Sequence, residues 1–370
     1  MDYDPEARRD TPLALKLKER IRRERPIAVA QYMQACLQDP EHGYYVTQPA
    51  IGGAGDFITA PEISQVFGEL VGLWCVVAWQ QMGSPAVVRL VELGPGRGTL
   101  MRDALRAAKV MPAFLAAVHV DLIETNTVLA ATQRATLSDA GVPLAWWKNL
   151  ADAPSDAPCL LVANEFLDAL PVSQSVLDNG AWTERVVTLD DAGRLAFGIS
   201  DVNRMPDQGR FSQANAGDID ESRNETPLLH DLLERSRRAP LAALFIDYGH
   251  MRSSLGETLQ AIRNHSFEHP LTSPGEADLT TQVDFQEFAE KAVATGLAVD
   301  GPATQAEFLG ALGIVQRASR LMAANPRIAH EIEAGVARLI SPTGMGTRFK
   351  AIGLRSASLP PLPGFPPATL

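Results

Sequence analysis

Three glycines at alternate positions follow an apolar run that ends in a carboxylate. Residues 88–100 read VRLVELGPGRGTL, so Glu92 precedes Gly94, Gly96 and Gly98, and a segment with helical character follows. An apolar run that leads through glycines into a helix is typical of a loop that brings the backbone close to a bound ligand. We therefore expect Glu92 and the three glycines to line a ligand site at the end of a strand.

The surroundings of the glycines constrain the identity of the ligand. A phosphate-binding P-loop needs a lysine and a serine or threonine directly after its glycines, and here Arg97 and Thr99 stand at the wrong spacing. A dinucleotide site prefers G-x-G-x-x-G and a pyrophosphate, which the carboxylate of Glu92 disfavours. The same carboxylate favours an ammonium group. S-adenosylmethionine carries an ammonium, a sulfonium and an adenosine but no phosphate, so it fits this motif.

A second carboxylate completes the expected cofactor site. Glu124 ends the apolar run VHVDLIE, and an acidic residue at the end of the second strand is the usual acceptor for ribose hydroxyls. The alternative is a tight turn that packs a helix on a sheet without any ligand. The presence of both carboxylates favours the ligand site.

The composition describes a globular protein with a sizeable core. The chain has 370 residues, of which 46% are hydrophobic and 21% charged, and its net charge is −11. This acidic balance argues against a nucleic-acid-binding protein, and we interpret the basic run at residues 16–25 as the solvated face of a helix. The three cysteines form no CxxC pair, which argues against a thiolate metal site and favours a reducing compartment. No apolar run approaches the ~20 residues of a membrane span.

From about residue 87 the sequence alternates between strands and helices. Continuous apolar runs predict parallel strands, covered on both faces, at Val88–Leu93, Val118–Glu124, Val142–Trp147, Cys159–Asn164 and Leu241–Tyr248. An alternating segment after Pro171 predicts a β-meander, the polar residues 200–225 predict a mobile loop, and residues 61–82 predict one long apolar helix. The expected division is an N-terminal helical segment at 1–86 and an α/β domain at 87–370, with an insertion at about 172–240.

Seven blocks of the sequence resemble one family. Besides VELGPGRGTLMRDALR, they are GDFITAPEISQVFGEL, ANEFLDALPV, WTERVV, FIDYGH, PGEADLTTQVDF and MGTRFK. The first resembles the glycine motif of class I methyltransferases, and together they resemble the MidA-like family from about Ala28 to Leu354. The resemblance implies a Rossmann-like, seven-stranded methyltransferase sheet, S-adenosyl-L-methionine as methyl donor and symmetric dimethylation of a protein arginine. It also implies a role in the assembly of respiratory complex I.

Polar residues at the strand ends are the candidates for catalysis. Asn164, Glu165 and Asp168 follow the fourth predicted strand, whose carboxyl end faces the methyl group in this fold. Carboxylates can hold two nitrogens of a guanidinium and draw its charge onto them, which leaves the third nitrogen able to attack. We expect Glu165 and Asp168 to be catalytic, together with Asp247 at the end of the fifth strand. Asn164 is expected to contact the cofactor. The alternative is that Glu165 and Asp168 cap the following turn.

The block GDFITAPEIS contributes one more candidate. Asp56 ends a glycine-rich segment, and we expect it to share the substrate guanidinium with Glu165. Thr59 and Glu62 have the spacing of a capping box before a helix that Pro61 opens, which explains both residues without a catalytic role.

Two further functions remain as alternatives. An NAD-dependent oxidoreductase would have a related fold, although the glycine spacing and Glu92 argue against it. A non-catalytic assembly protein would keep the fold and bind a partner. We expect a protein substrate, which the resemblance implies is an iron–sulfur or quinone-module subunit of complex I, and no nucleic acid. We expect no metal, since Pro270 interrupts the segment that contains His265 and His269. The expected location is the cytoplasm, with the mitochondrial matrix for eukaryotic relatives.

Overall fold

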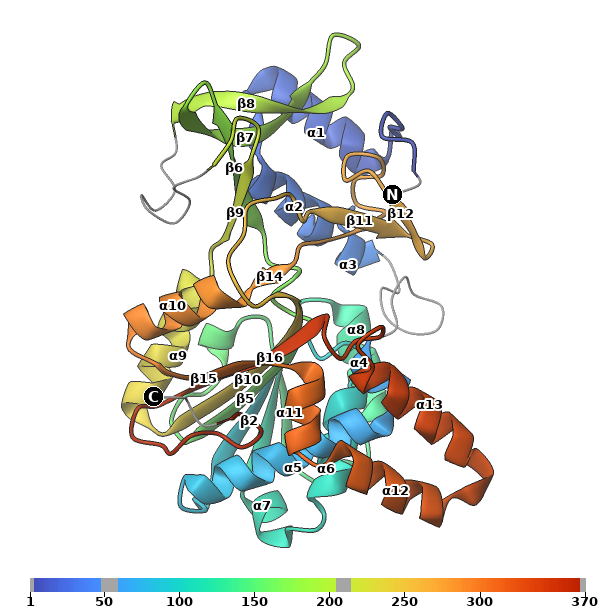
Figure 1. Ribbon diagram of the computed structural model, residues 1–370, viewed down its shortest axis with the longest axis vertical. Helices are drawn as coiled ribbons and strands as arrows, with labels where there is room; N and C mark the ends of the chain where they lie inside the picture. The colour runs from blue at the N-terminus through green and yellow to red at the C-terminus, as the bar shows by residue number, and fades with distance from the viewer. Residues whose placement is uncertain (1–2, 48–58, 204–213, 367–370) are drawn as a thin grey trace. The chain divides into compact units, whose positions relative to one another are not determined.

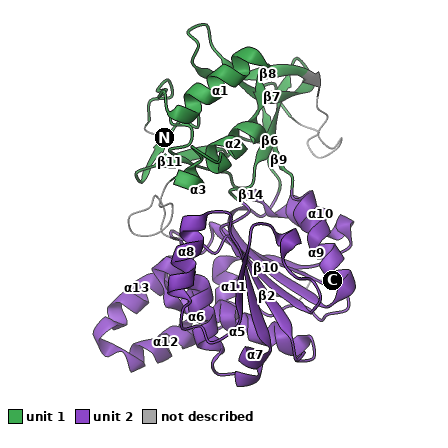
Figure 2. Cartoon of the chain, turned by 180° about the vertical axis from the view of Figure 1, so that it is seen from behind, with its two compact units in different colours: residues 1–57, 168–224, 253–282 green, residues 58–167, 225–252, 283–370 purple. Residues whose placement is uncertain are grey.

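The computed structural model describes residues 3–47, 59–203 and 214–366, which fold into two compact units (Figures 1 and 2). Unit 1 comprises Met1–Phe57, Asp168–Asn224 and Ser253–Gln282. Unit 2 comprises Ile58–Leu167, Glu225–Arg252 and Val283–Leu370. Each unit is therefore assembled from three separate stretches of the chain.

A mixed sheet forms the centre of unit 2 (Figure 1). Its strands lie in the order β15 (Ala298–Thr304), β16 (Phe349–Arg355), β10 (Leu241–His250), β5 (Cys159–Asn164), β2 (Val88–Leu93), β3 (Val118–Ile123) and β4 (Leu144–Trp147). The strands from β10 to β4 are parallel, whereas β16 runs antiparallel between β10 and β15. The expected α/β fold is confirmed. In the described residues the sheet has eight strands, because β14 (Val283–Asp284) pairs with the end of β10.

The order of the strands creates a crevice beside β2. The chain leaves β2 toward β3 and β4 and then returns to β5 on the other side of β2. Ligands of open α/β sheets bind where the strand order reverses, beyond the carboxyl ends of the strands. The carboxyl ends of β2 and β5 are neighbours, since Leu93 pairs with Ala163.

Helices cover both faces of this sheet, which explains the continuous apolar strands. The helices of unit 2 are α4 (Ala60–Ile63), α5 (Gln65–Gln81), α6 (Thr99–Ala108), α7 (Pro112–Ala117), α8 (Thr127–Thr136), α9 (Thr226–Arg238), α10 (Phe285–Thr295), α11 (Gln305–Ala311), α12 (Ile314–Ala324) and α13 (Ala329–Ile340). On one face the ring of Phe245 lies 5.2 Å from that of Phe288 in α10. On the other, Leu244 joins a core that includes Trp74 of α5.

The long apolar helix expected at residues 61–82 is interrupted. Ser64 adopts an extended conformation, with φ −155° and ψ 128°, and separates α4 from α5. Its hydroxyl accepts a hydrogen bond from Val66 N at 3.3 Å, so it caps α5. The apolar period continues through the break, which is why the sequence pattern predicts one helix.

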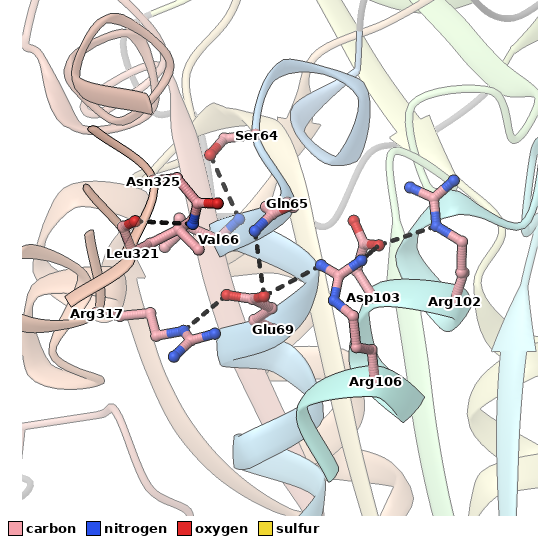
Figure 3. Close-up of polar contacts among 10 residues, drawn as sticks. All are labelled: Ser64, Gln65, Val66, Glu69, Arg102, Asp103, Arg106, Arg317, Leu321 and Asn325. Atoms are coloured by element: carbon pink, nitrogen blue, oxygen red, sulfur yellow. Dashed lines mark hydrogen bonds and ion pairs between the residues drawn. The ribbon is translucent and has the colours of Figure 1, made fainter. Parts of the chain in front are cut away.

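The helices α5, α6 and α12 are joined by ion pairs between one buried carboxylate and two partly exposed arginines (Figure 3). Glu69 of α5 is 2% exposed and accepts from Arg106 of α6 at 3.1 Å and from Arg317 of α12 at 2.7 Å. Arg106 also donates to Asp103 at 2.9 Å. Gly72 allows the backbones to approach, because a Cβ atom there would lie 2.4 Å from Ala104 O. The position of α6, which begins at the glycine loop, is thus fixed.

Unit 1 combines helices with two small sheets. Its elements are α1 (Pro12–Arg23), β1 (Ile27–Ala28), α2 (Val29–Gln38), α3 (Tyr44–Thr47), β6 (Val172–Asp178), β7 (Ala181–Leu189), β8 (Leu195–Asn203), β9 (Ile219–Arg223), β11 (Gln260–Arg263), β12 (Ser266–Glu268) and β13 (Asp278–Thr280). The expected meander is confirmed by β6, β7 and β8, which pair in sequence. Apolar residues such as Leu17, Tyr32 and Val187 form the core of unit 1.

The prediction of a mobile loop at residues 200–225 is wrong for both ends of this range, which form strands. The strand β8 extends to Asn203, and β9 pairs antiparallel with β6. Asp220 and Arg223 of β9 are buried, and their polarity hides the strand from a prediction based on apolar residues. Residues 204–213 lie outside the described part of the chain.

Candidate active site

The glycine loop after β2 is built on three left-handed backbone conformations. The φ angles of Gly94, Gly96 and Gly98 are 61°, 54° and 80°, and glycine adopts such angles without the steric cost of a side chain. Gly98 is the N-cap residue of α6. A Cβ atom on Gly94 would lie 3.3 Å from the ring of Phe166, so the loop approaches the turn that follows β5.

Glu92 is a buried carboxylate beneath this loop. It is 3% exposed, and its Oε2 atom has no hydrogen-bond partner among the described residues. Burial raises the pKa of Glu92 to about 8. A buried carboxylate oxygen without a partner is costly unless a ligand supplies a donor. These surroundings fit a cationic group such as an ammonium.

Gln133 of α8 links the glycine loop to Glu124. Its Nε2 atom donates to Gly96 O at 2.8 Å and to Glu124 Oε2 at 3.0 Å, and its Oε1 atom accepts from Trp146 Nε1 at 2.9 Å. Asn126 N also donates to Glu124 at 2.7 Å. Burial raises the pKa of Glu124, and these donors oppose that effect. The structure therefore brings Glu124 to the glycine loop, through a glutamine that no sequence pattern identified.

Glu165 occupies a strained position directly after β5. Its φ of 52° is in the left-handed region, which a non-glycine residue adopts at a cost of ~1–3 kcal/mol. Its Oε1 atom accepts from Ala60 N at 3.2 Å and from Asn164 Nδ2 at 3.1 Å. The Oδ1 atom of Asn164 is buried and has no hydrogen-bond partner within the described residues. Such strain at a strand end is frequent in functional sites.

Asp247 holds the turn that contains Glu165. It is 1% exposed and accepts from three backbone amides, Phe166 N at 3.1 Å, Leu167 N at 2.9 Å and Tyr248 N at 2.8 Å. These bonds tie β10 to the residues after β5. The arrangement suits a residue that positions Glu165.

The capping box expected for Thr59 and Glu62 is wrong. Thr59 is the N-cap residue of α4, but its side chain makes no capping hydrogen bond. The Oε1 atom of Glu62 instead accepts from the hydroxyl of Thr99 at 2.5 Å, at the start of α6. Glu62 therefore connects α4 to the first turn of α6.

Comparisons with known proteins identify the family of the chain. A family model described as "Putative S-adenosyl-L-methionine-dependent methyltransferase" matches residues 70–303. The chain belongs to this methyltransferase family. It is 35% identical to "Protein arginine methyltransferase NDUFAF7 homolog, mitochondrial" of Drosophila melanogaster, over 92% of this chain and 84% of the relative. It is 34% identical to the human "Protein arginine methyltransferase NDUFAF7, mitochondrial", over 93% of this chain and 83% of the relative.

A solved structure of a protein from Burkholderia thailandensis resembles this methyltransferase over almost its whole length. The two chains are 27% identical, with a TM-score of 0.82, and the match covers 96% of this chain and 93% of the other. That crystal structure contains bound S-adenosyl-homocysteine. The fold and S-adenosylmethionine as the methyl donor are therefore shown for this methyltransferase.

Two of the predicted catalytic residues of the methyltransferase are not placed in unit 2. Asp56 lies outside the described residues. Asp168 belongs to unit 1, where it is 7% exposed and its carbonyl accepts from Thr281 N at 3.0 Å. Burial and the nearby carboxylates of Asp278 and Asp168 raise the pKa of Tyr45. The catalytic roles of Asp56, Glu165, Asp168 and Asp247 stay predictions.

The described part of the methyltransferase contains no group of three His, Cys, Asp or Glu side chains that could hold a metal ion. His269, one of the histidines weighed as a ligand, accepts from Leu271 N at 3.1 Å, and burial lowers its pKa to about 4. None of the helices in residues 3–47, 59–203 and 214–366 has the length and apolar character needed to cross a membrane.

Proposed function

We propose that this methyltransferase methylates arginine side chains of a protein and that its product is symmetric dimethylarginine. Its relatives bear the name protein arginine methyltransferase. The observation that carries the proposal is Glu165, a carboxylate on a strained backbone after β5, where Ala60 and Asn164 orient it. A carboxylate kept at this end of the sheet suits a cationic acceptor such as a guanidinium.

We propose that the glycine loop holds the donor. In this arrangement Glu92 accepts from the ammonium group, Glu124 accepts from the ribose hydroxyls, and Gly94, Gly96 and Gly98 leave room for the methionine end. Asn164 contributes a buried carbonyl oxygen that lacks a partner in the described chain. When bound, S-adenosylmethionine supplies an electrophilic methyl group on a positively charged sulfur.

The chain's own groups then bind and orient the acceptor. Glu165 accepts hydrogen bonds from two nitrogens of the guanidinium, and this localises positive charge on them. We propose that Asp56 shares the guanidinium and that Asp168 assists in its binding. Asp247 acts as a positioning residue, because its carboxylate is occupied by three backbone amides. The contribution to catalysis is mostly alignment of the attacking nitrogen.

Calorimetric titration tests the donor site. We expect S-adenosylmethionine and S-adenosylhomocysteine to bind with a stoichiometry of about one, and NAD not to bind, because the site offers carboxylates where a pyrophosphate would lie. Binding of NAD with absence of S-adenosylmethionine binding would contradict the proposal and favour the oxidoreductase alternative.

Glu124→Ala is expected to weaken donor binding by roughly 1–3 kcal/mol, the range for losing a hydrogen bond to a charged partner. The reason is loss of the carboxylate that Gln133 and Asn126 orient toward the glycine loop. Calorimetry with S-adenosylhomocysteine measures the change. A 2′-deoxy analogue is the control, because it should lose less affinity from the substitution. Equal affinity of the natural ligand for wild type and variant would show that Glu124 does not contact the ribose.

Donor affinity is expected to rise with pH as Glu92 ionises. The pKa of Glu92 is about 8 in the folded protein, so its neutral form dominates at lower pH, whereas pairing with an ammonium needs the anion. The association constant should therefore increase as the pH rises toward about 8, with a slope of at most one proton, and fall at higher pH where the donor's ammonium group loses its own proton. The free energy of unfolding should fall over the same interval, from about pH 4.5 to 8, since the unfolded chain ionises earlier. Both trends should be absent in Glu92→Gln. A donor affinity in wild type that does not change with pH would contradict the pairing.

We propose that the substrate is an iron–sulfur or quinone-module subunit of respiratory complex I and that the methyltransferase acts during assembly of that complex. We also propose that the methyltransferase acts in the cytoplasm, although the relatives named above are mitochondrial. Mass spectrometry of complex I subunits from cells with and without the gene tests the substrate, and cell fractionation tests the compartment. Unchanged arginine methylation in every subunit would contradict the assignment.

A further inference from the structure

Glu62 reaches the glycine loop from an element that lies far from it in the sequence. Its Oε1 atom accepts from the hydroxyl of Thr99 at 2.5 Å, and Thr99 directly follows Gly98. The Glu62 carboxylate therefore lies at the first turn of α6, where the loop ends. In the described chain, no lysine or arginine forms an ion pair with Glu62.

The element that presents Glu62 is held on two sides. Ala60 N donates to Glu165 at 3.2 Å, which links α4 to the turn after β5. On the other side α4 contacts α13, where a Cβ atom on Gly335 would lie 3.0 Å from Ile63 O. Preorganisation of this kind reduces the entropy lost when a side chain binds a ligand. Glu62 is thus fixed in place before any ligand arrives.

An ammonium group donates three hydrogen bonds, and Glu92 Oε2 is one buried acceptor without a partner in the described chain, so further acceptors are needed. Glu92 and Glu62 approach the glycine loop from different elements, β2 and α4. Glu92 supplies the buried oxygen without a partner in the described chain, and Glu62 supplies a half-buried carboxylate with one neutral donor. Two carboxylates around one loop fit a cation better than either a phosphate or a neutral ligand.

We propose that Glu62 is a cofactor-binding residue that, together with Glu92, accepts the ammonium group of the methionine moiety of S-adenosylmethionine. This inference rests on the proposed placement of the donor at the glycine loop. The competing explanation is that Glu62 only ties α4 to α6 through Thr99. The two explanations differ in which substitution should weaken binding of the donor.

Glu62→Gln and Thr99→Ala separate them. The first removes the charge and keeps a hydrogen-bonding side chain, whereas the second removes the tie and keeps the carboxylate. We expect Glu62→Gln to weaken binding of S-adenosylhomocysteine about ten- to hundredfold, the range for a hydrogen bond to a charged group. Thr99→Ala should weaken it less than about threefold. Binding of 5′-methylthioadenosine, which lacks the amino-acid part, should be the same in wild type and in Glu62→Gln.

The outcomes are distinct. Equal losses in Glu62→Gln and Thr99→Ala, or an equal loss for both ligands in Glu62→Gln, would overturn the inference in favour of a structural tie. Unchanged S-adenosylhomocysteine binding in Glu62→Gln would overturn it while leaving the donor site intact. Failure of the wild type to bind S-adenosylhomocysteine would instead overturn the donor site itself. If Glu62→Gln unfolds, Glu62→Asp replaces it. That variant keeps the charge but withdraws it from the loop, and we expect it to lose at least threefold in affinity.

Discussion

Glu165→Gln is expected to bind S-adenosylmethionine almost as tightly as wild type and to lose about two to three orders of magnitude of methyl transfer to protein arginine. Among the proposed donor contacts on β2, α4, β5, the glycine loop and the residue after β3, only Asn164 bonds to Glu165, so the substitution leaves most of them in place. It removes the charge that holds the guanidinium. Transfer of labelled methyl groups into protein, measured beside donor affinity, reports both effects. Asp56→Asn is expected to behave in the same way.

The left-handed backbone at Glu165 supplies a control for stability. Asparagine tolerates a φ of 52° better than glutamate does, so Glu165→Asn should fold at least as stably as wild type and yet be inactive. Full activity in Glu165→Gln would show that the carboxylate only caps the turn. Loss of donor binding in that variant would place Glu165 in the cofactor site.

Gly96→Val is expected to abolish donor binding. Gly96 has a φ of 54°, and its carbonyl accepts from the Gln133 side chain that also holds Glu124. A β-branched side chain at this φ strains the loop. It also places atoms where the donor is expected to contact the loop backbone. Calorimetry with S-adenosylhomocysteine measures the loss, which should exceed the range of the assay.

Gly141→Val is the matched control for this substitution. Gly141 also has a positive φ, 70°, but a Cβ atom there would meet nothing within 4 Å. Both variants carry the same kind of backbone strain, of ~1–3 kcal/mol. Gly141→Val should therefore lose a similar amount of stability and keep donor binding. Equal donor affinity in Gly96→Val and Gly141→Val would show that the glycine loop is not part of the cofactor site.

The sequence predicts the central sheet well, because buried parallel strands are continuous apolar runs. β2 and β5 begin and end at the predicted residues, and Glu124 lies one residue beyond β3. The proposed site residues on these strands are predicted from their place at the strand ends. The glycine loop follows from the alternate spacing of Gly94, Gly96 and Gly98 after an apolar strand, since few residues other than glycine adopt such φ angles.

Other parts of the site depend on contacts that no local pattern encodes. Gln133 lies in a helix with no signal for its two bonds to Gly96 and Glu124. The contact of Glu62 with Thr99 does not follow from its capping-box spacing, which its own helix does not use. Unit 1 consists of three separate stretches, and such long-range assembly leaves no periodicity to read.

Methyl transfer into a protein tests the central claim most directly. The purified methyltransferase is incubated with labelled S-adenosylmethionine and with protein from cells that lack its gene, and the product is hydrolysed to amino acids. We expect the label in symmetric dimethylarginine, with no label above background when Glu165→Gln replaces the wild type. Label in lysine, histidine or a small molecule, or no transfer by a wild-type protein that binds the donor, would contradict the account.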